Sequence, residues 1–200
     1  LYAYDKNPIL IALLKHIQNK KPFYKITKSR YKVLREKWKN GKLSVDNYAE
    51  AGFAAFCYSY CGKEFAGYTA KYVRDGKKLD YSEERKNYYY SLQKNKSFMN
   101  CKLKETDYKK LKPEKSVIYC DPPYSNTTEY SQSVEVETFW DTMRKWTKNG
   151  NFVFISEYSA PDDFIKIDSH LKYTSIGGKG SQNIRSDNLY VHKSMKGKIK

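Results

Sequence analysis

The segment VIYCDPPYSNTTEY occupies residues 117–130, and the rest of the chain is best interpreted around it. Its first four residues, Val117 to Cys120, form a short run rich in β-formers, which predicts a buried strand. The strand must end abruptly, because neither Pro122 nor Pro123 has an N–H to donate to a sheet. Asp121 is pushed toward extended geometry by the proline that follows it. We therefore predict a rigid turn at the carboxyl edge of a sheet, where open α/β sheets place their ligands.

The groups at this turn suit the handling of a nucleobase amino group. Such a nitrogen is a poor nucleophile, because its lone pair is delocalised into the ring. The Asp121 carboxylate and the Pro122 carbonyl can each accept one of its N–H bonds, while Tyr124 can stack on a base extruded from the duplex. Catalysis of this kind depends on positioning and preorganised electrostatics. The alternative is a purely structural turn, since Asp-Pro commonly begins one.

The tetrapeptide Asp121-Pro122-Pro123-Tyr124 resembles the D-P-P-Y motif of the Dam-like, D12 class DNA adenine-N6 methyltransferases. The resemblance implies that these four residues are catalytic, that S-adenosylmethionine donates the methyl group, that double-stranded DNA is the substrate, and that no metal is required. It also implies contact between Asp121 and the cofactor. Cytosine-N4 methylation is a rival, but those enzymes more often carry Ser in place of the acid. Glutamine methylation of proteins is associated with N-P-P-Y.

Two further acidic positions are candidates for cofactor binding. Asp5 follows a probable strand end at Leu1 to Tyr4 and precedes a helix, which is where nucleotide-binding folds hold ribose hydroxyls. The family resemblance implies that Asp5 binds the ribose of S-adenosylmethionine, and that Asp107 and Tyr108 contact its adenine. The simpler alternatives are a helix cap for Asp5 and an ordinary surface turn for Asp107-Tyr108.

The formal net charge of +16, from 38 basic and 22 acidic residues, indicates a polyanionic partner. Twenty tyrosines are interleaved with these lysines and offer hydroxyls to phosphates and rings to bases. A lysine-rich genome would produce a similar composition without a nucleic-acid partner. The glycine-containing interval at residues 61–78 predicts a loop or hairpin that touches DNA. The candidate DNA contacts are Lys63, Lys71, Arg74, Lys77, Lys78 and Asn126.

The overall prediction is an α/β fold with a Rossmann-like methyltransferase sheet. Residues 1–24 and 96–200 form the predicted catalytic domain, and residues 25–95 form a helical, basic target-recognition insertion. Apolar periodicity predicts helices at 9–17, 48–60 and 137–148. Strands are expected at 98–103, 151–156, 164–167, 171–176 and 189–192, with the last ones forming an antiparallel hairpin.

A missing family motif, the four cysteines and the expected cellular location complete the sequence analysis. The F-x-G-x-G loop of the resembled family is not found among these residues, and it is expected to precede Leu1. A protein that binds DNA without activity, whether truncated or degenerate, is therefore the alternative function. The spacing of Cys57, Cys61, Cys101 and Cys120 does not suggest a metal site and favours reduced thiols. We expect a cytoplasmic protein of bacterial or phage type with no membrane segment. A monomer is expected, and a cognate restriction enzyme is a candidate partner.

Overall fold

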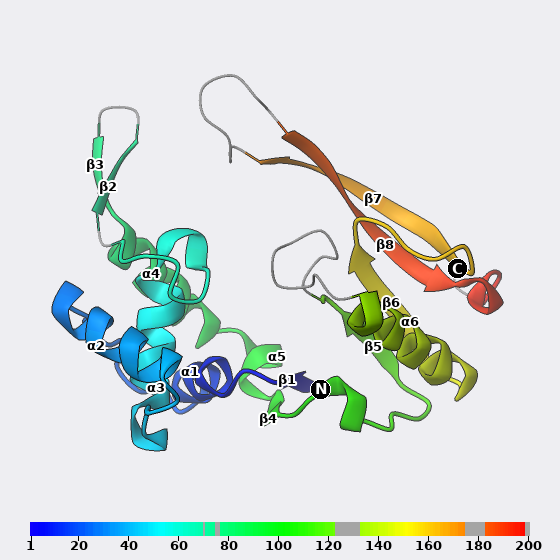
Figure 1. The fold of residues 1–200 in the computed structure, drawn as a ribbon, viewed down its shortest axis with the longest axis horizontal. Helices are drawn as coiled ribbons and strands as arrows, with labels where there is room; N and C mark the ends of the chain where they lie inside the picture. Colours follow the sequence, from blue (N-terminus) through cyan, green and yellow to red (C-terminus); the bar gives the residue numbers. More distant parts are fainter. Residues whose placement is uncertain (70, 75–76, 123–132, 175–182, 199–200) are drawn as a thin grey trace. The chain divides into compact units, whose positions relative to one another are not determined.

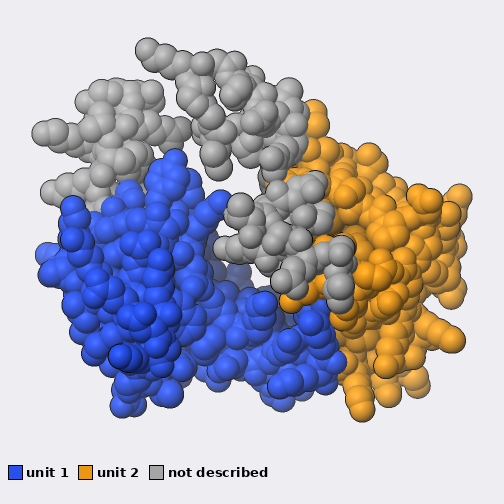
Figure 2. Space-filling view, in the orientation of Figure 1, with its two compact units in different colours: residues 1–110 blue, residues 111–200 orange. Residues whose placement is uncertain are grey.

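The computed structural model describes residues 1–69, 71–74, 77–122, 133–174 and 183–198. By their contacts the residues divide into two compact units, Leu1–Lys110 and Leu111–Lys200 (Figures 1 and 2). Helices occur together with both parallel and antiparallel strand pairs, so the predicted α/β class is confirmed. No helix within the described ranges is long and apolar enough to cross a membrane.

The first unit consists mainly of helices. These are α1 (Pro8–Gln18), α2 (Lys28–Lys39), α3 (Tyr48–Gly52), α4 (Tyr81–Leu92) and α5 (Lys96–Met99). Strand β1 (Tyr2–Asp5) pairs in parallel with β4 (Lys102–Glu105). Strands β2 (Lys71–Arg74) and β3 (Lys77–Asp80) form an antiparallel pair, so of the loop or hairpin predicted at 61–78 the structure has the hairpin, placed toward the end of that interval.

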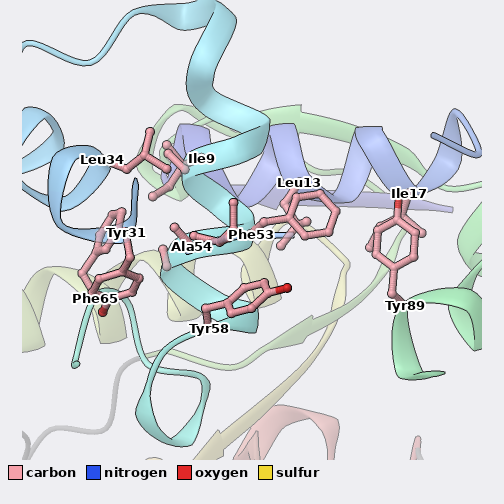
Figure 3. Close-up of a cluster of buried hydrophobic side chains, with 13 residues drawn as sticks. Ile9, Leu13, Ile17, Tyr31, Leu34, Phe53, Ala54, Tyr58, Phe65 and Tyr89 are labelled. Carbon is pink, nitrogen blue, oxygen red and sulfur yellow. The ribbon is translucent and has the colours of Figure 1, made fainter. Parts of the chain in front are cut away.

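A cluster of thirteen buried side chains holds the helices of the first unit together (Figure 3). Phe53 is completely buried, and its ring meets those of Phe23 and Tyr89 with centroids 5.0 and 5.3 Å apart. Helix α1 and helix α3 cross closely at Gly52, because a side chain at this position would lie 2.4 Å from the carbonyl oxygen of Ile9. The small residue therefore sets how near the two helices approach.

Two elements of the first unit differ from the predictions. The predicted strand at 98–103 begins as helix α5, because the Asn95 side chain accepts a hydrogen bond from the Phe98 N–H at 2.9 Å and starts a helical turn. The strand proper is β4, four residues later than expected. The predicted helix at 48–60 is also shorter: α3 ends at Gly52, a π-helical turn spans Phe53–Cys57, and Cys61 adopts a φ of +54°.

The second unit contains a mixed four-stranded sheet with the order β5-β6-β8-β7. Strand β5 (Val117–Cys120) runs parallel to β6 (Phe152–Glu157). Strand β8 (Asn183–His192) is antiparallel to both β6 and β7 (Phe164–Thr174), so the predicted terminal hairpin is confirmed. The two short strands predicted at 164–167 and 171–176 are instead one long strand, with an irregularity between Lys166 and Asp168.

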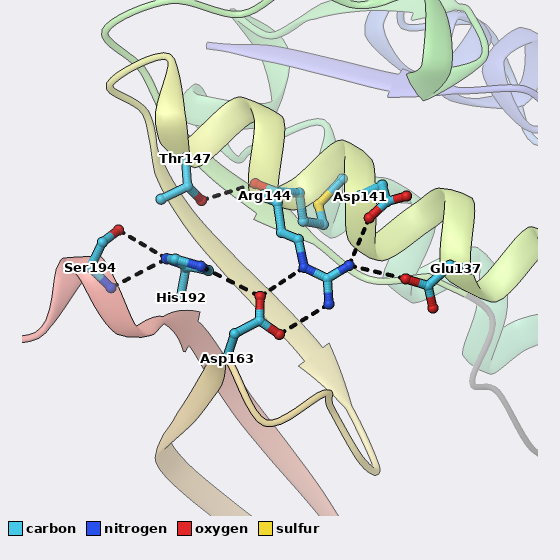
Figure 4. Close-up of polar contacts among 8 residues, drawn as sticks. Glu137, Asp141, Arg144, Thr147, Asp163, His192 and Ser194 are labelled. Atoms are coloured by element: carbon cyan, nitrogen blue, oxygen red, sulfur yellow. Dashed lines mark hydrogen bonds and ion pairs between the residues drawn. The ribbon is translucent and has the colours of Figure 1, made fainter.

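Helix α6 (Ser133–Lys148) packs beside the parallel strands and is tied to the chain before β7 by one ion-pair network (Figure 4). The guanidinium of Arg144 donates to both carboxylate oxygens of Asp163, at 2.7 and 3.0 Å, and also to Asp141 at 2.7 Å. The hydrogen bonds from Arg144 lower the pKa of the Asp163 carboxyl below its usual value. This bidentate geometry favours the ionised acid.

The network predicts a pH-dependent contribution to stability. The folded-state pKa of Asp163 is lowered, so its contribution is present above the unfolded-state pKa of about 3.9 and is lost as pH falls through the folded-state value. The side chains of Arg144 and Asp163 are 31% and 35% exposed, which limits the expected cost of Asp163→Asn to about 1 kcal/mol at pH 7. Urea unfolding should show this difference beginning to shrink as the pH falls below about 3.9 and disappearing once the pH is below the lowered folded-state pKa. Asp162→Asn, at the exposed neighbouring acid, serves as control and should have no such effect.

Candidate functional site

The predicted catalytic turn follows β5 in the second unit. Strand β5 has the bounds predicted from the sequence, but the prediction that it is buried is wrong: Val117 and Tyr119 are 77% and 65% exposed, because only the alternate side chains, Ile118 and Cys120, face the interior. Cys120 is paired with Ile155 of the parallel strand β6. Asp121 comes directly after this pair and is exposed, and Pro122 is partly exposed. Pro123, Tyr124 and Asn126 lie outside the described residues. The acid is therefore at the carboxyl end of a parallel strand and accessible, as a residue that touches a substrate must be.

A buried asparagine that the sequence did not single out fixes the start of β5. The side chain of Asn151 is fully buried between helix α6 and strand β6. Its Oδ1 accepts the Ser116 N–H at 3.0 Å, and its Nδ2 donates to the carbonyls of Pro113 and Trp146, both at 2.8 Å. Three backbone groups from two segments are thus satisfied by one amide. The position of β5, and with it that of Asp121, depends on this anchor.

Asn151→Ala is expected to lower the free energy of unfolding by about 2 kcal/mol, because it leaves buried backbone groups without their partner. Equilibrium urea unfolding would measure the loss. Asn149→Ala is the matched control, since Asn149 is exposed at the end of α6, and it should cost less than about 0.5 kcal/mol. Equal effects of the two substitutions would show that Asn151 is not an anchor.

Strand β6, beside the predicted catalytic turn, ends in a hydrogen-bonded polar arrangement. Glu157 is 3% exposed, and its carboxylate accepts the N–H of Tyr158 at 2.8 Å. The carbonyl of Tyr158 accepts hydrogen bonds from Asn188 Nδ2 at 2.9 Å and from the Tyr190 hydroxyl at 3.2 Å. Both the N–H and the carbonyl of Tyr158 are therefore hydrogen-bonded to side chains, which fixes the end of β6 next to Asp121.

Three of the four predicted cofactor residues, Asp5, Asp107 and Tyr108, lie in the first unit, whereas Asp121 lies in the second. Strands β1 and β4 run parallel with Asp5 opposite Glu105, and the Thr106 N–H donates to the carbonyl of Asp5 at 2.9 Å. Asp107 and Tyr108 follow β4 directly, so the structure brings all three predicted residues to the carboxyl ends of two neighbouring strands. Their side chains are partly buried.

Both carboxylates also support the local backbone. Asp5 Oδ1 accepts the N–H of Asn7 at 2.7 Å, and Asp107 Oδ1 accepts that of Lys109 at 2.9 Å. Carboxylates accept up to four hydrogen bonds, so these contacts leave each acid capacity for a ligand's hydroxyl or amino hydrogens. The acceptors at this edge fit the ribose hydroxyls and adenine amino group of an adenosine cofactor.

Four of the predicted DNA contacts belong to one hairpin. Lys71 and Arg74 lie on β2, and Lys77 and Lys78 lie on β3, with Arg74 paired to Lys77 and Val73 to Lys78. Their side chains lie outside the described part of the structure. Lys63 belongs to the preceding segment and is exposed. The neighbouring Glu64 was not singled out by the sequence, although it is one of only two acids in the basic, glycine-containing interval 61–78, and it makes two long-range hydrogen bonds.

The four cysteines are free thiols, as expected. Burial raises the pKa of both Cys57 and Cys120 to about 12, because it penalises the thiolate, and the Sγ of Cys120 lies 3.5 Å from the Sδ of Met143. Among the described residues, no group of three or more His, Cys, Asp or Glu side chains is arranged to hold a metal ion.

Fold and site together define an α/β protein with acidic residues at the carboxyl ends of parallel strands, the class that binds ligands at this edge. The model of the D12 class N6 adenine-specific DNA methyltransferases matches residues 5–161, and the chain belongs to this family. The match covers the segments that contain Asp5, Asp107 and Asp121. A comparison with curated proteins gives no match.

Proposed function

We propose that this protein transfers a methyl group from S-adenosylmethionine to the N6 amino group of adenine in DNA. The observation that carries the proposal is the exposed Asp121, followed by two prolines, at the end of a parallel strand within the matched region. A structural turn alone does not require an accessible acid at this edge. The family match supports adenine over cytosine as the target.

In the proposed mechanism, Asp121 and the Pro122 carbonyl each accept one N–H bond of the target amino group. These contacts favour a pyramidal nitrogen, whose lone pair is then available for attack. Tyr124 stacks on the face of the extruded base. The bound cofactor supplies an electrophilic methyl group on sulfur: the new N–C bond forms in line as the C–S bond breaks, leaving S-adenosylhomocysteine. One amino proton is then released to solvent.

Asp5 would hold the ribose of the cofactor, while Asp107 and Tyr108 would hold its adenine. Support comes from the location of all three at the ends of β1 and β4, where their remaining hydrogen-bonding capacity matches an adenosine group. An additional contact from Asp121 to the cofactor is part of this proposal. The chemistry requires no metal ion.

DNA would be bound through the basic surface that the net charge of +16 provides. We propose that residues 25–95 form the target-recognition insertion, that the hairpin β2–β3 contacts DNA through its four basic residues, and that Lys63 and Asn126 add contacts. We also propose that residues 1–24 and 96–200 form a catalytic domain with a Rossmann-like sheet. The parallel pairs β1–β4 and β5–β6 support this. A monomeric cytoplasmic enzyme, with or without a restriction partner, is consistent with it.

The test is transfer of a tritiated methyl group to unmethylated double-stranded DNA, with the product nucleoside identified by chromatography. N6-methyladenine is the expected product. Labelled N4-methylcytosine would assign the rival base specificity. If the folded protein transfers no label but binds DNA with a steep salt dependence that the cofactor does not change, a binding module is the correct assignment.

A further inference from the structure

A strained segment of the first unit lies against its core and carries an outward-facing acid. In residues 60–67, the non-glycine residues Cys61 and Phe65 adopt φ values of +54° and +47°. Phe65 is 4% exposed, packs on Tyr31 with ring centroids 5.5 Å apart, and donates its N–H to the carbonyl of Ala55. Such backbone conformations persist where the surrounding structure holds them in place. The segment is therefore fixed on the core, and the neighbouring Glu64 is held in a defined position.

The carboxylate of Glu64 joins helices α1 and α2, and it is 57 and 26 positions away from its two partners in the sequence. Its Oε1 accepts the indole N–H of Trp38, on α2, at 2.6 Å, and its Oε2 accepts an amide hydrogen of Asn7, which caps α1. Both donors are neutral, so these contacts are hydrogen bonds rather than ion pairs. A carboxylate offers acceptors on both oxygens, whereas a glutamine side chain would turn an NH2 group toward one of the two donors.

The two hydrogen bonds accepted by Glu64 form a clamp on Trp38 and Asn7. Asn7 connects this clamp to Asp5, the first predicted cofactor residue. The other atom of its side-chain amide, Oδ1, accepts the N–H groups of Ile9 and Leu10, each at 3.1 Å. Its backbone N–H donates to Asp5 Oδ1 at 2.7 Å. Hydrogen bonds thus run continuously from Trp38 through Glu64 and Asn7 to the carboxylate of Asp5. The orientation of Asp5 depends on where Asn7 is held.

We infer that Glu64 is a positioning residue for the cofactor site: through Asn7 it holds Asp5 in the orientation that accepts the ribose hydroxyls. This inference rests on the proposed function, in which Asp5 binds S-adenosylmethionine. Glu64 also follows Lys63, a proposed DNA contact, so a single segment reaches both the DNA-binding surface and the cofactor acid. Glu64 touches neither substrate in this assignment and acts only through Asn7.

The experiment measures the binding of S-adenosylhomocysteine by titration calorimetry to the wild-type protein, Glu64→Gln and Trp38→Phe. Glu64→Gln should raise the Kd roughly fivefold to tenfold, because one hydrogen bond of the clamp is lost and Asp5 is less well oriented. Trp38→Phe, which removes one donor, should raise it less. Glu64 is exposed, so the Tm of Glu64→Gln should remain within about 2 °C of the wild type. Glu36→Gln makes the same chemical change at an exposed site on α2 and should leave the Kd unchanged.

A second readout separates positioning from a general structural role. The indole N–H resonance of Trp38 should shift when S-adenosylhomocysteine binds to the wild type, because its acceptor belongs to the same hydrogen-bonded chain, and this shift should be absent in Glu64→Gln. Unchanged Kd values in both variants would overturn the inference while the proposed function stands. A Kd increase that parallels a large fall in Tm would also overturn it. If the wild type itself binds no S-adenosylhomocysteine, the cofactor assignment fails, and the inference fails with it.

Discussion

Asp121→Ala is expected to lower the rate of adenine methylation roughly 10²- to 10³-fold, measured as single-turnover transfer of tritiated methyl groups. This is the typical loss when one preorganised hydrogen-bonding group is removed from a reacting centre. The loss should appear in kcat, because the carboxylate acts on the amino nitrogen as it becomes pyramidal, and KM for DNA should change little. Asp121→Asn retains one acceptor of similar shape and should be less impaired.

Folding and DNA binding provide the controls for this experiment. Asp121 is exposed, so its removal should change the Tm by no more than about 4 °C, which leaves the protein folded at the assay temperature. DNA binding should be equal or slightly tighter, because one negative charge is lost near a polyanion. Asp162→Ala, at an exposed acid just before β7, should retain full activity. Equal activity of Asp121→Ala and wild type would contradict the catalytic role proposed for the DPPY motif.

Gly52→Ala is expected to destabilise the first unit by about 3 kcal/mol. In an ordinary helix interior this substitution stabilises by up to ~1 kcal/mol, since alanine has the higher helix propensity. Here the added methyl group would lie 2.4 Å from the carbonyl oxygen of Ile9 and 2.7 Å from the Cβ of Leu13. Backbone atoms cannot rotate away as a flexible side chain can, so α1 and α3 must move apart.

Gly41→Ala is the matched comparison, because alanine is disfavoured at this position by backbone strain and not by steric crowding. Gly41 has a φ of +64° and no neighbouring atom within 4 Å of the added methyl group, so only backbone strain is introduced. Its expected cost is about 1 kcal/mol. Urea unfolding of both variants therefore compares crowding with strain. A neutral or stabilising effect of Gly52→Ala would contradict the close crossing of α1 and α3.

Residues whose structure depends on near neighbours were predicted correctly. The strand at 117–120 has the predicted bounds, and the helix predicted at 9–17 is α1, longer by one residue at each end. Pro8 and the Asn7 cap define the start of that helix locally. A loop or hairpin was expected at 61–78, and the structure has an antiparallel strand pair at Lys71–Arg74 and Lys77–Asp80. The roles proposed for Asp5, Asp107 and Asp121 remain predictions, although the structure shows each of them at the end of a parallel strand.

Residues whose role depends on distant partners could not be found in this way. Glu64 and Asn7 are 57 positions apart, and Asn151 reaches Pro113 over 38. Neither hydrogen bond leaves a period or a local motif in the sequence. One local signal was also missed: Asn95 caps helix α5 through the N–H of Phe98, three residues away, where a strand was predicted. The π-helical turn at Phe53–Cys57 interrupts the apolar pattern that predicted a helix at 48–60.

The sequence by itself determined the α/β class, the resemblance to the methyltransferase family and the end of the strand before Asp121, because apolar periodicity and proline act within a few residues. Only the tertiary structure decided which buried amide anchors β5, which glycine permits α1 to cross α3, and which glutamate holds the turn at Asp5. Hydrogen bonds and packing between remote segments exist only once the chain has folded, so their geometry selects these residues.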